Sequence, residues 1–142
     1  MKTIRLIIAV LLFLPFVACN SQSTNKQAEV SDNQSDKIEA YYFHFTNRCV
    51  TCNTIEAKAK ENLETLYPEQ VRQGLITFRS VNIEESVNKP LADKLGVSGQ
   101  ALLLVKGDKK INLTNEGFLY AVGKPEKFRE IINVNVDGLL AQ

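Results

Sequence analysis

Residues 38–66 of this chain read IEAYYFHF, TNR, CVTC and NTIEAKAKENLETL in succession. The first eight residues are mostly β-branched and aromatic, which is typical of a strand with both faces covered. The last fourteen place four apolar side chains at helical spacing, namely Ile55, Ala59, Leu63 and Leu66. Pro68 then ends the pattern. The sequence therefore predicts a buried strand, a short loop and a helix whose start carries two cysteines.

The two cysteines lie at the predicted junction of strand and helix, as Cys49-Val50-Thr51-Cys52. Cys49 falls at the helix N-terminus, where free amide groups and the helix dipole favour an anion, and the neighbouring Arg48 adds a positive charge that we expect to stabilise the thiolate. Lowering a thiol pKa from ~8.5 to ~7 raises the thiolate fraction at neutral pH from a few per cent to about half. A spacing of three brings both sulfurs within bonding reach. We therefore expect Cys49 to attack a disulfide and Cys52 to resolve the product.

The residues alone leave three uses for this pair open: thiol–disulfide exchange, binding of a thiophilic ion such as Cu(I) or As(III), and a structural bridge. A structural bridge over so short a loop contributes about 2 kcal/mol of stability at best. The position of the cysteine pair at a helix start favours redox chemistry over such a bridge. His44 is the only histidine in the chain. Together with the two cysteines it would leave a zinc site one ligand short, and we predict no metal site.

Alternation between strands and helices continues toward the C-terminus. Strands are predicted over residues 75–83, 101–105 and 109–113, and helices over residues 86–95 and from Pro125 onward. Residues 115–122 fit a helical turn or a strand, and residues 134–140 either continue the last helix or fray. The order βαβαββα predicts a mixed sheet with a parallel start, a hairpin finish and helices on both faces, which is a three-layer α/β/α sandwich.

The N-terminal residues read as a targeting segment. Lys2 and Arg5 frame the start of an apolar run over residues 6–17, which as a helix spans about 18 Å and is too short to cross a hydrocarbon core of roughly 30 Å. The run ends in Ala18-Cys19 and resembles a bacterial lipobox, in which the cysteine is acylated and becomes the first mature residue. A plain signal peptide cut near Ala18 is the alternative.

Three parts are therefore expected along the chain. They are a lipoprotein signal peptide at residues 1–18, a lipidated Cys19 with a disordered tether to residue 36, and one folded domain at residues 37–142. The tether is rich in Asn, Ser and Gln and cannot bury enough apolar surface to become ordered. A net charge of +1 over 142 residues, with no cluster of excess Lys and Arg, argues against a nucleic-acid partner. The expected location is a membrane facing the periplasm, reached through the lipid anchor.

Residues 37–142 resemble the thioredoxin-like fold. Besides the dithiol, the stretch Leu95-Gly96-Val97-Ser98-Gly99-Gln100-Ala101-Leu102-Leu103-Leu104 is similar to the segment that enters the third core strand of thioredoxins. With its lipoprotein start, the chain resembles the small exported thioredoxin-like proteins of Bacteroides-type bacteria, some of which are named arsenic-operon nitroreductase subunits. The resemblance implies dithiol chemistry without an organic cofactor, and a redox partner protein.

Two positions depart from thioredoxins. Ala101 stands where thioredoxins have a cis-proline. Because a non-proline cis bond costs about 2.5–4 kcal/mol, we expect a trans peptide after Gln100 and a substrate groove reshaped around Gln100 and Ala101. Phe43 stands where thioredoxins carry a buried aspartate that accepts a proton from the resolving thiol. Glu84 and Glu85 follow the second predicted strand and are candidates for that role.

The predicted function is that of a membrane-tethered, periplasm-facing thiol–disulfide oxidoreductase using Cys49 and Cys52. Two alternatives stay open at this stage. One is a binding module for Cu(I) or As(III), and the other is a non-catalytic accessory subunit of a redox complex.

Overall fold

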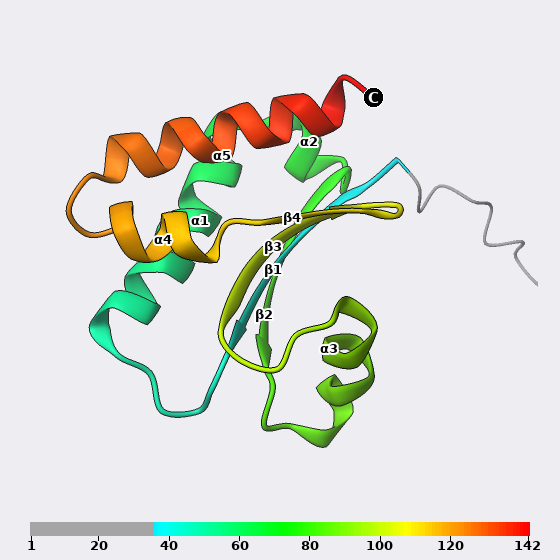
Figure 1. Cartoon of the computed structure of the whole chain (residues 1–142). Coiled ribbons are helices and arrows are strands. Elements are labelled where there is room, and N and C mark those ends of the chain that lie inside the picture. The colour runs from blue at the N-terminus through cyan, green and yellow to red at the C-terminus, as the bar shows by residue number, and fades with distance from the viewer. Residues whose placement is uncertain (1–35) are drawn as a thin grey trace, which may run out of the picture.

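A four-stranded sheet runs through the middle of the structure, a computed structural model that describes residues 36–142 (Figure 1). Its strands are β1 (Ile38–His44), β2 (Ile76–Asn82), β3 (Ala101–Lys106) and β4 (Lys109–Asn112), in the order β2-β1-β3-β4. β1 pairs in parallel with β2 and antiparallel with β3, which in turn pairs antiparallel with β4. The predicted parallel start and hairpin finish are confirmed, and the fold is mixed α/β.

β1 is a central strand, and its side chains enter two separate cores. Successive side chains of a strand point to opposite faces of the sheet. Tyr42 accordingly belongs to one core, whereas Tyr41 and Phe43 belong to the other. All three aromatic side chains are buried, which confirms the prediction of a strand covered on both faces.

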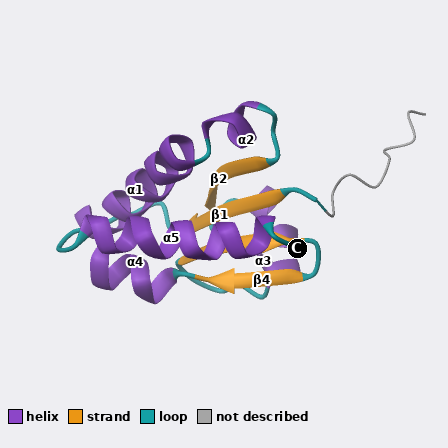
Figure 2. Cartoon of the chain, turned by 90° about the horizontal axis from the view of Figure 1, so that it is seen from above, coloured by secondary structure: helices purple, strands orange, loops and turns teal. Residues whose placement is uncertain are grey.

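Three helices cover the face to which Tyr42 points: α1 (Val50–Leu66), α4 (Thr114–Tyr120) and α5 (Pro125–Leu140) (Figure 2). A short helix, α2 (Pro68–Arg72), follows α1. Apolar side chains from this helical layer and from the sheet form one core. It includes Tyr42, Ile55, Ala59, Leu63, Leu102, Leu104, Ala121, Phe128, Ile132, Val136 and Leu139. This packing holds α1 against the sheet, with its N-terminus just beyond the end of β1.

The opposite face of the sheet is covered by a 3₁₀ turn, η1 (Ser86–Asn88), and the helix α3 (Lys89–Leu95) (Figure 1). Ala92 and Leu95 of α3 pack against Phe43, Val81 and Ala101 in the second core. α3 ends at Gly96, whose φ of 68° lies in the left-handed region that glycine adopts without strain. The prediction of helices on both faces is confirmed.

The structure also decides the segments that the sequence pattern left open. The ambiguous residues 115–122 lie mostly in α4, and residues 134–140 continue α5. Pro68 ends α1 and also begins α2, because proline fits the first helical position, where its missing N–H has no helical partner anyway. The predicted helix over residues 86–95 is divided into η1 and α3 just before Pro90.

The predicted signal peptide, the acylated Cys19 and most of the tether lie outside the described residues. Within residues 36–142, none of the helices combines the length and the apolar character needed to span a bilayer.

Candidate functional site

Cys49 is the N-cap residue of α1. Its backbone is extended, with φ −79° and ψ 163°, and its Sγ accepts a hydrogen bond from the backbone N–H of Cys52 at 3.2 Å. This contact satisfies one of the amide groups that a helix start leaves without a partner. The first turn of α1 contains no acidic residue that would oppose negative charge on the sulfur. The helix therefore favours an anion at Cys49.

Cys49 and Cys52 form a disulfide, with their Cα atoms 5.1 Å apart. The predicted pairing of the two sulfurs is confirmed. Cys49 is exposed, whereas Cys52 is only 7% exposed and lies on the core side of α1. The pair is thus asymmetric, with one sulfur open to an incoming reactant and the other shielded behind it.

The loop between β1 and α1 is tied to the end of β2. The backbone N–H of Thr46 donates to Glu84 Oε2 at 2.7 Å, and Asn82 Nδ2 donates to Thr46 Oγ1 at 3.0 Å. Hydrogen bonds from the Thr46 hydroxyl and its backbone N–H hold the pKa of Glu84 below its ordinary value of 4.5. Glu84 is exposed and anchors this loop, so it is not a buried carboxylate behind the dithiol. Glu85 is also exposed, and its Oε2 accepts a hydrogen bond from Asn88.

Arg48 lies beside the disulfide with its guanidinium directed at other partners. It forms an ion pair with Glu56 of α1, and its Cζ lies 5.6 Å from the centroid of the Tyr42 ring. The arginine and glutamate side chains are each about one-fifth exposed. Glu56 thus balances the charge of Arg48, and stabilisation of the Cys49 thiolate by Arg48 stays a prediction.

Gln100 links the buried cysteine to Tyr42. Its Oε1 lies 3.5 Å from Cys52 Sγ, and its Nε2 donates a hydrogen bond to the Tyr42 hydroxyl. Burial raises the pKa of Tyr42 above its ordinary value, so the hydroxyl keeps its proton at neutral pH. The sequence pattern identified Tyr42 only as a core aromatic. Strand alternation, which places Tyr42 on the face opposite Phe43, was the available signal for its position next to α1.

The positions that depart from thioredoxins are both in the second core. Phe43 is completely buried against Val81, Ala92 and Ala101, on the α3 side of the sheet. The peptide bond that joins Gln100 to Ala101 is trans, as expected, and residues 36–142 contain no cis peptide bond. Neither side chain brings a charged group to the dithiol.

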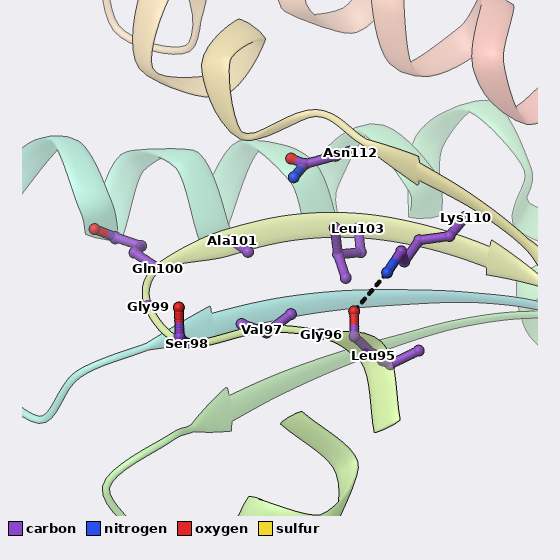
Figure 3. Close-up of a pocket in the computed structure, with 10 residues that line it drawn as sticks. All are labelled: Leu95, Gly96, Val97, Ser98, Gly99, Gln100, Ala101, Leu103, Lys110 and Asn112. Carbon is purple, nitrogen blue, oxygen red and sulfur yellow. Dashed lines mark hydrogen bonds between the residues drawn. The ribbon is translucent and has the colours of Figure 1, made fainter. Parts of the chain in front are cut away.

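A cavity of about 300 Å³ opens on the α3 side of β3 and β4 (Figure 3). Its lining includes the loop Gly96–Gln100 together with Ala101, Leu103 and Lys110. Lys110 Nζ donates to the carbonyl oxygen of Leu95 at 2.6 Å and closes one side of it. The Gln100 side chain points away from the cavity toward α1, so this residue borders both the cavity and the disulfide (Figure 3). The predicted groove role of Gln100 and Ala101 stays a prediction.

His44 lies on the same face of β1 as Tyr42, and the two ring centroids are 6.2 Å apart. Its Nδ1 donates to the carbonyl oxygen of Phe45 at 2.8 Å. Among residues 36–142, no cluster of three or more His, Cys, Asp or Glu side chains could hold a metal ion.

Comparison with known proteins adds little to this picture. No known family model and no curated protein matches the chain. One solved structure that resembles it is described as a malarial protein, with 18% sequence identity and a TM-score of 0.40. The match covers 62% of this chain and 96% of that one. So weak a likeness supports no conclusion, and the inferences below depend on the residues of this chain.

Proposed function

We propose that this protein is a thioredoxin-like thiol–disulfide oxidoreductase that an acylated Cys19 holds on the periplasmic side of a membrane. The observation that carries the proposal is the asymmetric disulfide at the start of α1, with an exposed Cys49 and a shielded Cys52. The parallel pair β1–β2, the hairpin β3–β4 and the helices on both faces support the thioredoxin-like assignment.

The proposed reaction transfers two electrons between this dithiol and a disulfide of a redox partner protein. The Cys49 thiolate attacks one partner sulfur, forms a mixed disulfide and releases the other partner sulfur as a thiolate. The Cys52 thiolate then attacks Cys49 Sγ, which re-forms the intramolecular disulfide and releases the second partner thiolate. Both leaving thiolates take up protons from solvent, so the partner is reduced by two electrons as the dithiol is oxidised.

The helix start supports the first of these steps. The Cys52 N–H that reaches Cys49 Sγ at 3.2 Å donates more strongly to a thiolate than to a neutral sulfur. The α1 dipole acts in the same direction, because Cys49 is the N-cap. We therefore expect the reduced protein to have a Cys49 thiol pKa below ~8.5.

The test uses the full-length chain carrying Cys52→Ser, expressed in its native envelope. Cys49 should form a stable mixed disulfide that runs as a larger species in non-reducing electrophoresis and disappears on reduction. The chain carrying both Cys49→Ser and Cys52→Ser is the matched control and should trap nothing. An ultraviolet titration of the thiolate supplies the second readout. A Cys49 pKa at or above 8.5 together with no trapped partner would rule the proposal out.

The lipid anchor is tested independently of the dithiol. Mass spectrometry of the mature N-terminus should find an acylated Cys19, and Cys19→Ala should move the protein out of the membrane fraction. A mature chain that begins elsewhere and carries no acyl group would contradict the anchor and leave the dithiol chemistry standing.

A further inference from the structure

The side chain of Gln100 spans the space between the buried sulfur and the buried tyrosine. Its Oε1 lies 3.5 Å from Cys52 Sγ, and its Nε2 is hydrogen-bonded to the Tyr42 hydroxyl. Cys52 is 7% exposed and Tyr42 is 1% exposed, so water has little access to either partner. Tyr42 is in turn held in place by the core between the sheet and α1, and by Arg48, whose guanidinium lies over its ring.

The sulfur of Cys52 changes its hydrogen-bonding character through the reaction. A thiol donates weakly, a disulfide sulfur has no proton and accepts weakly, and a thiolate accepts strongly. A carboxamide offers a donor at Nε2 and an acceptor at Oε1, and the tyrosine hydroxyl both donates and accepts. In the disulfide, Oε1 faces a sulfur that has no proton to donate, so the 3.5 Å approach is a contact and not a hydrogen bond. The same orientation accepts the S–H of a thiol, and a reversal of the Gln100 carboxamide donates an N–H to a thiolate, with Tyr42 changing between acceptor and donor.

We infer that Gln100, held by Tyr42, is a catalytic residue that stabilises the Cys52 thiolate in the resolving step, an inference that rests on the proposed function. When Cys52 is a thiol, Oε1 faces the sulfur and Nε2 donates to the Tyr42 oxygen. When the proton leaves for solvent, the carboxamide reverses. Nε2 then donates to the thiolate, and the Tyr42 hydroxyl donates to Oε1. Tyr42 is the positioning residue of this arrangement.

The structure gives a reason why such a donor is needed. Burial disfavours a thiolate at Cys52, because an anion loses its hydration there. Neither position expected to supply a carboxylate places one behind the dithiol, since Phe43 is packed in the second core and Glu84 is an exposed loop anchor. An N–H donor placed at the sulfur offsets part of the desolvation cost without adding a negative charge next to the thiolate.

Each step of the resolving reaction balances. The Cys52 proton passes to solvent, the thiolate attacks Cys49 Sγ, and the bond between Cys49 and the partner sulfur breaks. The leaving thiolate takes up a proton from solvent. The two electrons that reduce the partner come from the two cysteines alone.

The first test measures the resolving rate with glutathione disulfide as the probe. Reduced full-length protein is mixed with the probe, quenched in acid and analysed by mass spectrometry for the Cys49–glutathione adduct. Gln100→Leu should slow loss of the adduct about tenfold at neutral pH and move the midpoint of its pH profile up by about one unit, near the lower end of what a hydrogen bond to a charged group contributes. Tyr42→Phe should act in the same direction by a smaller factor. The Gln100 carboxamide is still present in this variant, but it has lost the hydrogen bond to the Tyr42 hydroxyl that positions it.

The matched control is Gln73→Leu, at an exposed glutamine that follows α2 at the far end of α1. It should leave both the rate of adduct formation and the rate of adduct loss unchanged. Adduct formation should also be unchanged in Gln100→Leu, because Gln100 contacts the second sulfur and not the first. A Gln100→Leu protein that unfolds more easily but keeps the wild-type pH profile would show a purely structural role and overturn the inference.

The second test observes the carboxamide itself by nuclear magnetic resonance. In the reduced protein carrying Cys49→Ser, the side-chain carbonyl and amide resonances of Gln100 should change as the pH is raised through the pKa of the Cys52 thiol, and Tyr42→Phe should alter that change. Those of Gln73 should not change over the same pH range. Gln100 resonances that stay constant while the Cys52 thiol titrates would exclude the reversal.

The two proposals fail in different ways. If no variant and no wild-type protein forms the Cys49 adduct, the oxidoreductase proposal fails. If the adduct forms and resolves at the same rate and with the same pH profile in wild type, Gln100→Leu and Tyr42→Phe, the oxidoreductase proposal stands and the role of Gln100 is refuted.

Discussion

The contact between α4 and α1 can be tested by adding one methyl group. A Cβ built on Gly117 of α4 would lie 2.9 Å from Ile55 Cγ2, and 3.5 Å from both Ile55 Cγ1 and Ile55 Cδ1. Ile55 is fully packed in the core, three residues after Cys52, and has little room to move. Overpacking of this kind costs about 1–3 kcal/mol. Because alanine stabilises a helix relative to glycine by up to about 1 kcal/mol, Gly117→Ala alone understates the steric cost.

Gly138 of α5 provides the matched control. A Cβ at this exposed position meets no atom within 4 Å, so Gly138→Ala should stabilise the protein by about 0.5–1 kcal/mol through helix propensity alone. The difference in stability between the two variants then isolates the clash with Ile55 and should be about 1–3 kcal/mol.

Urea unfolding followed by circular dichroism measures both variants. Because small proteins lose about 1–3 kcal/mol of stability per molar urea, each kcal/mol corresponds to a shift in the urea midpoint of roughly 0.3–1 M. The Gly117→Ala midpoint should therefore fall clearly below that of Gly138→Ala, with the same slope. If Gly117→Ala is stabilised as much as Gly138→Ala, Gly117 of α4 does not lie this close to Ile55 of α1.

Three further outcomes are expected. Phe43→Asp should lower the free energy of unfolding in urea by about 3 kcal/mol or more, because it buries an unpaired carboxylate in the second core. Phe43→Leu is the apolar control, and equal stability of the two variants would contradict this prediction. Stability should fall as the pH drops through the folded-state pKa of Glu84, because a group with a lowered pKa contributes stability above its ordinary value of 4.5 that is lost on protonation. Glu84→Gln should remove this part of the pH dependence of the unfolding midpoint, because glutamine does not titrate, and an unchanged pH dependence would contradict the bond to Thr46. Tyr67→Phe should cost about 1–2 kcal/mol in the same assay, because the hydroxyl donates to Asp137 Oδ1 at 2.7 Å and joins the end of α1 to α5, and no loss would show that this bond is not formed.

The local elements could be predicted because their patterns are local. Apolar spacing identified α1, the four strands and the final helix to within a few residues. The interpretation stayed open at residues 115–122, where Gly117 lowers helix propensity and exposed apolar side chains obscure the pattern. The close approach to Ile55 explains the glycine, since a Cβ at this position would clash and only a glycine lets α4 come so near to α1. That reason lies in a contact between residues far apart in the chain.

Only the part of the candidate site that depends on neighbouring residues could be predicted from the sequence. Cys49 and Cys52 are three residues apart, so the start of the helix alone places the two sulfurs within bonding reach. Gln100 was identified by its place before the third core strand, but its contact with Cys52 was not. Tyr42 was interpreted only as a core residue.

Local patterns in the sequence are enough to predict the order of strands and helices, and a dithiol at a helix start. These properties follow from side-chain spacing over a few residues, which sets the periodicity and the reach of neighbouring groups. The surroundings of the buried sulfur depend instead on long-range packing. Pairing of β1 with β3 brings Gln100 to Tyr42 and to Cys52, across 58 and 48 positions of the chain. Such contacts depend on strand register and on which face of the sheet each residue occupies. The spacing of residues along the chain does not predict either of these.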